Sequence, residues 1–403
     1  MTTPSITRNQ RQTFLRLWRG VGPHVATDHN LPARIQTILR RREFGSRDRR
    51  LYRELLYTAV RYLPWAEELA TRAEAEVVRA LAWLAADTPA THEFRSELVA
   101  AWPECPGSVA ARAQFLGVSS GLLPEWFRPH CPEAFVPPNL EALATRPPLW
   151  IRLQTADAGE CLAEFAGRGW PIRPSAALPS GFEVLAEADL TTTRAFQEGR
   201  IEIQDLGSQL ILASASIDPA GCWLDACAGA GGKTLQLATL VGPAGRVDAH
   251  DIRPEALAEL RERARRGGFS NIRVLAQVPG QAIYDGVLVD APCSGSGTWR
   301  RAPHLKWCTT PGGIAIHAAR QRQLLERLCR QVRPGGWLVY ATCSLSRVEN
   351  QEVVESFLEG HPEFTTMPPA HPFGCVAGAA GLTILPAIHD TDGYFVCPMQ
   401  RRR

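Results

Sequence analysis

The stretch LDACAGAGGKT, residues 224–234, combines the end of a strand, a glycine-rich loop and the start of a helix. An apolar run at 222–224 leads into it, and the glycines let a ligand approach the backbone closely. The helix that follows offers free N–H groups in its first turn. The stretch is not a P-loop, because Cys227 stands where that motif has its first glycine. We therefore predict a ligand-binding strand–loop–helix unit; a tight turn without a ligand is the alternative.

Short apolar runs alternate with helical patterns from about residue 201 onward, for example at 254–266 and 318–332. This alternation predicts a parallel sheet with helices on both faces. Residues 382–400 predict two more strands around a turn, an antiparallel hairpin at the edge of that sheet. The runs predicted to be parallel strands are Cys222–Leu224, Arg246–His250, Ile272–Ala276, Gly286–Val289 and Trp337–Tyr340.

The part of the chain before residue 201 divides in two. Leucines, an alanine and a tyrosine recur at helical spacing in 51–62, which favours a helical first part. Prolines gathered in 129–148 indicate a linker, and apolar runs at 149–153 and 182–185 then flank a predicted helix at 158–167. The predicted domains are a helical domain at 1–145, a small α+β domain at 146–200 and an α/β domain at 201–403.

The composition of the 403 residues, with 45% hydrophobic and 21% charged residues, is typical of a soluble globular protein. No run of eighteen apolar residues predicts a membrane helix, and the first twenty residues do not resemble a secretion signal. The eleven cysteines are scattered and lack the spacing of zinc ligands. We therefore expect a cytoplasmic protein with reduced thiols, no bound metal and no membrane partner.

Charge is distributed unevenly along the helical part. Residues 1–62 have a net charge of +9 and residues 63–145 a net charge of −6, although the whole chain has only +3. A basic face near the N-terminus is suited to a polyanion such as nucleic acid. A solvated helix surface without a partner is the alternative.

Three further segments place polar or nucleophilic side chains where predicted strands end. Asp251 ends the second strand, 22 residues after Gly229, at the distance typical of an acid that holds ribose hydroxyls. The segments DAPCSGSG (290–297) and ATCS (341–344) each place a cysteine just past a strand. A single cysteine in such a place is more often inert core. Two of them, at the carboxyl edge that carries the glycine-rich loop, favour a functional role.

Four motifs in order, DACAGAGGKT (225–234), DAPCSGSG, RRAPHLKW (300–307) and ATCSLSRVEN (341–350), resemble those of the Nol/Nop/Sun family of RNA cytosine-5 methyltransferases. QDLGSQ at 204–209 and DGYF at 392–395 also match family segments, and GSRDRR at 45–50 is similar to a NusB-like RNA-binding domain.

The resemblance implies a fold as well as a reaction. The expected fold is a Rossmann-like S-adenosylmethionine-dependent methyltransferase with a doubly wound, mostly parallel sheet of seven strands and an antiparallel edge hairpin. It would follow a NusB-like helical domain and a small RRM-like subdomain at 146–200. The expected partner is RNA, most of all ribosomal RNA of the small subunit, and the expected state is a monomer.

The resemblance also implies roles for individual residues. Cys343 matches the family nucleophile, which adds to carbon 6 of cytosine and so makes carbon 5 able to attack the methyl donor. Cys293 matches the cysteine that assists release, Asp290 would contact the donor and the base, and Lys306 would place a positive charge near the base or a phosphate. Asp251 would hold the donor ribose, and Gln277 stands where the family usually has an aspartate near the adenine. The loop residues expected to hold S-adenosylmethionine are Cys227, Ala228, Gly229, Ala230, Gly231, Gly232 and Lys233.

Two other functions remain open from the sequence. DNA cytosine-5 methyltransferases also have a Pro-Cys motif with a downstream Glu-Asn, as in Pro292-Cys293 and Glu349-Asn350, but the additional cysteine at 343 favours RNA. A non-catalytic RNA-binding or ribosome assembly factor with a degenerate donor pocket is the other alternative. Gln277 supports it, and the two intact cysteines oppose it.

Overall fold

The computed structural model describes residues 4–155, 157–280 and 283–403 and divides into two compact units. The helical unit comprises the chain up to Arg146 together with Thr298–Pro311. The α/β unit comprises Pro147–Gly297 together with Gly312–Arg403. Among the described residues, every helix is too short or too polar to cross a lipid bilayer.

The helical unit is built around a core of aromatic and aliphatic side chains that includes Phe14, Leu55, Trp65 and Trp83. The residues of 51–62 that recur at helical spacing are buried in this core. The region predicted as a linker is ordered here into short helical turns. The α-helices of the unit are α1 (Pro4–Val21), α2 (Leu31–Leu39), α3 (Ser46–Arg61), α4 (Leu63–Ala70), α5 (Glu74–Leu84), α6 (His92–Val99), α7 (Val109–Leu116), α8 (Asn139–Leu143) and α14 (Leu305–Cys308).

The segment 298–311 contributes to the helical unit, although the sequence boundaries assign it to the α/β domain. The indole N–H of Trp307 donates to the carbonyl of Val60 at 2.8 Å, and the thiol of Cys308 lies 3.2 Å from the carbonyl of Val25. Tryptophan has a large apolar surface that gains free energy on burial, so Trp307 fixes the segment against α3.

The α/β unit begins with a four-stranded antiparallel sheet in the order β2-β3-β1-β4. The helix α9 (Gly159–Gly167) packs on it through Cys161 and Phe165. The strands are β1 (Leu149–Leu153), β2 (Ile172–Pro174), β3 (Gly181–Val184) and β4 (Ile201–Ile203), and α10 (Arg194–Gln197) precedes β4.

The larger sheet has the order β11-β12-β13-β9-β8-β5-β6-β7, with β10 pairing with β13. The five predicted parallel strands are confirmed, and the parallel pairs run from β7 to β9. The sheet has nine strands rather than the seven expected, because β10 and β11 extend the antiparallel end beyond the predicted hairpin. The strands are β5 (Cys222–Asp225), β6 (Arg246–Ala249), β7 (Ile272–Val274), β8 (Tyr284–Asp290), β9 (Val332–Thr342), β10 (Phe364–Thr366), β11 (Val376–Gly378), β12 (Gly381–Ile384) and β13 (Tyr394–Arg401).

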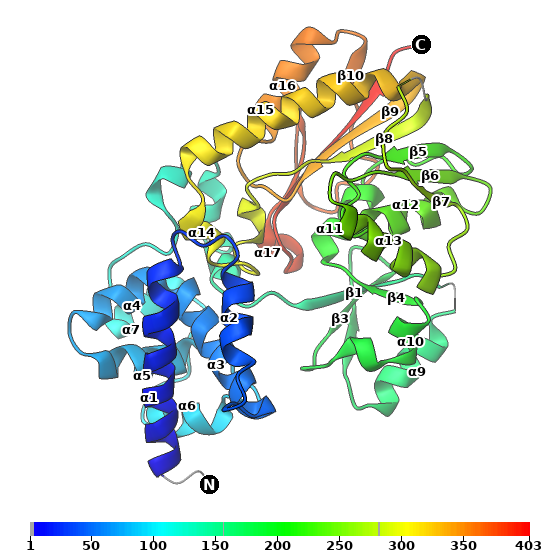
Figure 1. The fold of residues 1–403 in the computed structure, drawn as a ribbon. Helices are drawn as coiled ribbons and strands as arrows, with labels where there is room; N and C mark the ends of the chain where they lie inside the picture. Colours follow the sequence, from blue (N-terminus) through cyan, green and yellow to red (C-terminus); the bar gives the residue numbers. More distant parts are fainter. Residues whose placement is uncertain (1–3, 156, 281–282) are drawn as a thin grey trace. The chain divides into compact units, whose positions relative to one another are not determined.

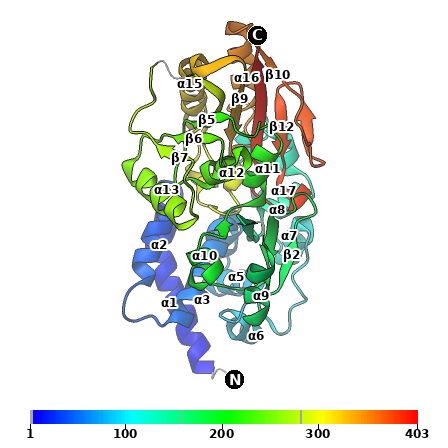
Figure 2. The same cartoon turned by 90° about the vertical axis from the view of Figure 1, so that its right-hand side faces the viewer.

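Helices cover both faces of the parallel strands, which gives the unit its Rossmann-like fold (Figures 1 and 2). Leu224, Val287 and Tyr340 pack on one face with α15 (Pro311–Leu328) and α16 (Gln351–Gly360). Their sequence neighbours pack on the other face with α11 (Leu206–Ala213) and α12 (Gly232–Val241), because side chains alternate along a strand. The helix α13 (Pro254–Arg266) buries Leu257 and Leu260 beside Ala249. The carboxyl ends of the strands therefore form one shared edge, where ligands bind in such folds.

Candidate active site

Two thiols meet at the carboxyl edge of the sheet. β8 and β9 are parallel neighbours with Asp290 opposite Ala341, so the segments that follow them leave the sheet side by side. The sulfurs of Cys293 and Cys343 lie 3.3 Å apart, and both residues are half-buried. Gly297 lies against Gly393, where a Cβ would be 2.0 Å from the Gly393 carbonyl, so only glycine allows this packing. The structure thus brings together the two cysteines that the sequence predicts for the site.

A buried carboxylate holds the two cysteine segments together. Glu349 is fully buried and accepts the backbone N–H of Ser294 at 2.8 Å. It also accepts the hydroxyls of Ser294 at 2.5 Å and Ser344 at 2.6 Å, so it joins the residues that follow each cysteine. Buried polar groups of both segments thus have a shared partner, and leaving any of them unpaired would cost about 1–3 kcal/mol. In the sequence, Glu349 stands out only as part of a Glu-Asn pair, so its role in positioning the two cysteine segments could not be predicted.

The surroundings of Cys293 favour its protonated form. The hydrogen bond to Cys343 raises the pKa of Cys293 well above its usual value, and burial and the charges of Cys343 and Glu349 raise it further. A thiol that keeps its proton can donate a hydrogen bond to a neighbouring sulfur. The geometry therefore suits a pair in which Cys293 is the hydrogen-bond donor to the sulfur of Cys343.

Lys233 and Asp290 form an ion pair beside the thiols, with 2.8 Å between Nζ and Oδ2. Burial alone would lower the pKa of Lys233, but the charge and hydrogen bond of Asp290 and the charge of Cys343 together raise it. The ammonium is therefore positive. The Asp290 side chain is 29% exposed, which leaves it able to contact a substrate as well.

The glycine-rich loop joins β5 to α12 and approaches the end of β6. The N–H of Ala228 donates to the His250 carbonyl at 2.9 Å, and the N–H of Gly229 donates to Asp251 at 2.8 Å. Gly231 has φ +92°, and a Cβ there would lie 2.2 Å from Leu260, so the turn requires glycine. Burial raises the pKa of Cys227, which keeps that thiol neutral.

Asp225, the last residue of β5, is a further candidate that the sequence reasoning did not select. It is buried, one carboxylate oxygen accepts the Thr234 hydroxyl at 2.7 Å, and the other has no partner among the described residues. Burial, helped by the charge of Asp290, raises the pKa of Asp225 to about 7. An unsatisfied buried acceptor next to the loop fits a ligand that brings hydrogen-bond donors.

The structure places Asp251 at the loop and Gln277 just past the end of β7. Burial would raise the pKa of Asp251, but hydrogen bonds from Arg253 and Gly229 lower it, so the carboxylate is ionised. Gln277 is exposed three residues after β7, which ends at Val274. Its contact with the adenine of a bound donor stays a prediction.

The half-buried Arg263 and the buried Arg152 donate hydrogen bonds to the loop. Arg263 of α13 donates to the Ala230 carbonyl at 2.7 Å and pairs with Glu202 of β4 at 2.7 Å. Glu202 is buried and also pairs with Arg266 at 2.8 Å. Arg152 of β1 donates to the Gly232 carbonyl at 3.5 Å. The small sheet thus helps to fix the loop, and a buried carboxylate with two arginine partners is well compensated.

Lys306 lies in the helical unit, and the structure gives no support to the expected contact with a base or phosphate. The residue is 1% exposed and its side-chain nitrogen donates to the carbonyls of Arg61 at 2.9 Å and Leu122 at 3.2 Å. The two N–H groups that a neutral amine keeps are enough to bridge both carbonyls. We infer from these contacts that Lys306 stabilises the helical unit.

The burial of Lys306 predicts a pH-dependent stability. Burial, together with the charge of Arg61, lowers the pKa of Lys306 from 10.5 to about 7. Between these values the unfolded chain binds a proton that the folded chain does not, so the free energy of unfolding rises with pH. Urea titrations from pH 6.5 to 9.5 should show this rise in the wild type relative to Lys306→Met. A difference between the two proteins that does not change with pH would contradict the prediction.

Comparison with known proteins relates the α/β unit to one group of enzymes. Residues 212–400 match the family model described as 16S rRNA methyltransferase RsmB/F. The chain is 32% identical over 271 residues to the probable ribosomal RNA small subunit methyltransferase B of Bacillus subtilis, covering 63% of this chain and 59% of that relative. The chain therefore spans less than two thirds of the length of this relative.

Solved structures share the fold. The crystal structure of PH0851 matches all of both chains with a TM-score of 0.74 at 21% identity. The crystal structure of NSun6 from Pyrococcus horikoshii with SFG matches 69% of this chain and 97% of that one, with a TM-score of 0.62 at 19% identity. At these identities the similarity demonstrates a common fold.

Proposed function

We propose that the chain is an RsmB-like member of the Nol/Nop/Sun family and that it methylates carbon 5 of a cytosine in small-subunit ribosomal RNA, because residues 212–400 match the family model described as 16S rRNA methyltransferase RsmB/F. The observation that carries this proposal is the pair of thiols 3.3 Å apart at the ends of β8 and β9. Carbon 5 of cytosine is a poor nucleophile, and covalent addition at carbon 6 divides one difficult step into easier ones. The pair supplies a thiolate for addition and a protonated neighbour for release.

Cys343 is the proposed nucleophile. Its thiolate forms a bond to carbon 6, and the electrons of the carbon 5–carbon 6 double bond become available at carbon 5 for methylation. Lys233 favours the thiolate before addition, and Asp290 accepts a hydrogen bond from the amino group of the base. Both side chains lie at the edge where Cys343 leaves the sheet.

Cys293 is proposed to act in release. The proton on carbon 5 leaves to water, the double bond forms again, and the bond between carbon 6 and the Cys343 sulfur breaks with its electron pair on sulfur. The S–H of Cys293 donates to that sulfur, since the two sulfurs are in hydrogen-bond contact. A donor aimed at the place where negative charge develops lowers the barrier to this step.

The glycine-rich loop is proposed to hold S-adenosylmethionine, which supplies an electrophilic methyl group on a sulfonium sulfur. The loop residues Cys227–Lys233 line the turn, and the ionised Asp251 can accept ribose hydroxyls. The unpartnered oxygen of Asp225 can accept from the amino group of the donor. The carboxylates of Asp251 and Asp225 thus match the ribose hydroxyls and the amino group of S-adenosylmethionine.

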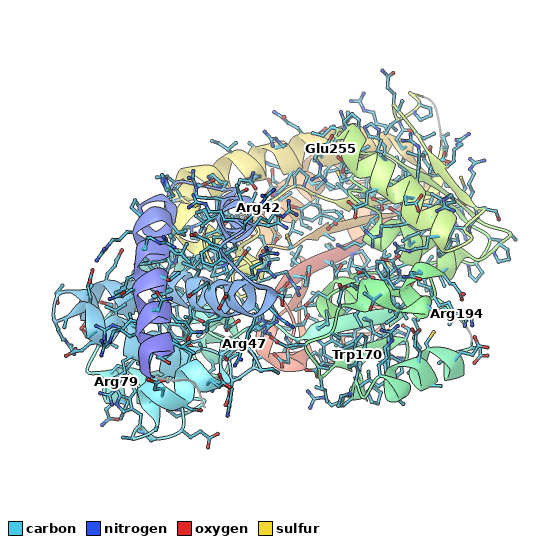
Figure 3. All side chains as sticks on the ribbon, turned by 60° about the horizontal axis from the view of Figure 1, so that its bottom comes forward. Arg42, Arg47, Arg79, Trp170, Arg194 and Glu255 are labelled. Atoms are coloured by element: carbon cyan, nitrogen blue, oxygen red, sulfur yellow. The ribbon has the colours of Figure 1, made fainter. Side chains whose placement is uncertain are left out.

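The other domains have supporting roles in this proposal. The domains remain those predicted at 1–145, 146–200 and 201–403, with 298–311 added to the first on the basis of its packing. The helical domain is proposed to be NusB-like and to bind RNA through its basic N-terminal part, where Arg42 and Arg47 project from the surface (Figure 3). The small sheet domain is proposed to be RRM-like, and the enzyme to be a cytoplasmic monomer.

A labelled-donor assay tests the proposed function. Purified protein, S-adenosylmethionine with a labelled methyl group and unmodified small-subunit ribosomal RNA should give label in 5-methylcytidine after digestion to nucleosides. Duplex DNA of the same sequence should accept at least about a hundredfold less label, because its target base is paired and stacked, and extruding it costs a few kcal/mol. Label in another nucleoside would contradict the proposed reaction. Absence of both label and calorimetric donor binding would favour the assembly factor.

A further inference from the structure

Four arginines on and just after α15 make no ion pair in the part of the chain that the structure describes. They are Arg320, Arg322, Arg327 and Arg330, and all except the half-buried Arg322 are exposed. Three of them line an open groove of about 560 Å³ with Ala319, Gln323 and Glu326. We call these four residues the α15 arginines.

The absence of partners distinguishes the α15 arginines from most arginines of the α/β unit. Many of the other arginines in this unit form an ion pair with an acidic side chain, including exposed arginines on α10, α13 and β9. The arginines of this unit that have an acidic partner are Arg168, Arg173, Arg194, Arg200, Arg246, Arg253, Arg263, Arg265, Arg266, Arg273, Arg333 and Arg347. The one acid of the groove, Glu326, pairs with His361 at 3.0 Å. The groove therefore keeps a net positive charge.

Stabilisation of α15 itself explains only part of this charge. Cations in the last turn of a helix interact favourably with its dipole, which accounts for Arg327 and Arg330. Arg320 and Arg322 lie more than a turn before the end of α15, where this effect has fallen off. A binding role accounts for all four.

The first two α15 arginines flank a turn that contacts the thiol site. Gln321, between Arg320 and Arg322, points inward and donates to the Pro292 carbonyl at 3.0 Å and to Glu349 at 3.2 Å. The same turn of α15 that supports the segment of Cys293 therefore carries two of the free arginines.

We propose that the α15 arginines bind the phosphate backbone of the substrate RNA along a line that starts at the turn contacting the thiol site, an inference that rests on the proposed function. The nine residues from Arg320 to the end of α15 extend about 13 Å, enough for several phosphates, and Arg330 lies in the turn that follows. The guanidinium fork binds phosphate through two parallel hydrogen bonds, and such contacts position a nucleic acid without reading its sequence. The α15 arginines would thus hold the strand while the site acts on one base.

A matched pair of variants tests this surface. One variant replaces the four α15 arginines by glutamine. The control replaces Arg194, Arg265, Arg333 and Arg347 by glutamine, which removes the same charge from exposed arginines that already have acidic partners. Figure 3 shows Arg194 on the small sheet domain. Fluorescence anisotropy with a labelled fragment of small-subunit ribosomal RNA gives the dissociation constant at several salt concentrations.

The α15 variant should bind the RNA at least about tenfold more weakly at low salt. The slope of log affinity against log salt should also become shallower by about 3, because four phosphate contacts on a single strand release fewer counterions. The control should keep both values near those of the wild type. Equal weakening in the two variants, or full affinity in the α15 variant, would overturn the proposal.

Two further measurements separate this proposal from the proposed function. Calorimetric binding of S-adenosylmethionine should be unchanged in the α15 variant, which shows that the fold is intact. If the wild type binds RNA through these arginines but transfers no methyl group, the proposed function fails and this surface stands. If the wild type methylates RNA and the α15 variant keeps its affinity, the surface fails and the function stands.

Discussion

Replacing Cys343 by alanine should reduce methyl transfer to RNA on the order of a thousandfold or more. Alanine has no nucleophile, so carbon 6 of the cytosine receives no electron pair and carbon 5 stays unreactive. The donor loop, the Lys233–Asp290 ion pair and the helical unit do not depend on this sulfur for their hydrogen bonds. Binding of S-adenosylmethionine and RNA should therefore stay within a few-fold of the wild type.

A second thiol provides the control for Cys343→Ala. Cys222 is half-buried at the first residue of β5, and the active edge lies at the other end of that strand. Cys222→Ala removes the same atom and should leave the rate of methyl transfer nearly unchanged. Comparable loss in both variants would indicate that the thiols support folding, and undiminished transfer by Cys343→Ala would sink the covalent mechanism.

Replacing Cys293 by alanine should trap the enzyme on its substrate. The thiolate of Cys343 can still add to the base, but the hydrogen bond that stabilises it as a leaving group is gone. A covalent protein–RNA species should accumulate and survive denaturing electrophoresis, while turnover falls by about a hundredfold. The species should require S-adenosylmethionine to reach the methylated stage.

The double variant decides which sulfur forms this bond. Cys293→Ala combined with Cys343→Ala should give no covalent species, because the nucleophile is absent. A covalent species in the double variant would point to a different nucleophile. Rapid turnover by Cys293→Ala without any trapped species would remove Cys293 from the release step.

The positions of the strands and of the two cysteines could be predicted because local sequence determines them. The apolar runs before Asp290 and Cys343 specify parallel strands, and the carboxyl ends of parallel strands share an edge. The fold followed from the same alternation. The strands β10 and β11 could not be predicted in this way, because neither belongs to an apolar run such as the one at 272–276 that predicted β7.

The residues that were missed or placed elsewhere depend on contacts between distant parts of the chain. In the sequence, Glu349 is simply part of a Glu-Asn pair. Only the fold shows that it accepts hydrogen bonds from Ser294 and Ser344. In the sequence, Lys306 lies in a motif between the two cysteine motifs. In the fold, its partners Arg61 and Leu122 are in the helical unit. A motif indicates which residues belong together in a family, and tertiary packing decides what each one touches.

The packing of 298–311 with the helical unit has a consequence for how the nascent chain folds. The first helices leave the ribosome early, but the tryptophan and lysine that complete their core follow only after the parallel strands up to β8 have been made. At roughly 5–20 residues per second, this delay lasts roughly ten to thirty seconds. During that interval the helical part exposes apolar surface that only the later segment covers. Such surface is the kind that chaperones bind. The order in which the chain is synthesised therefore affects how this unit assembles.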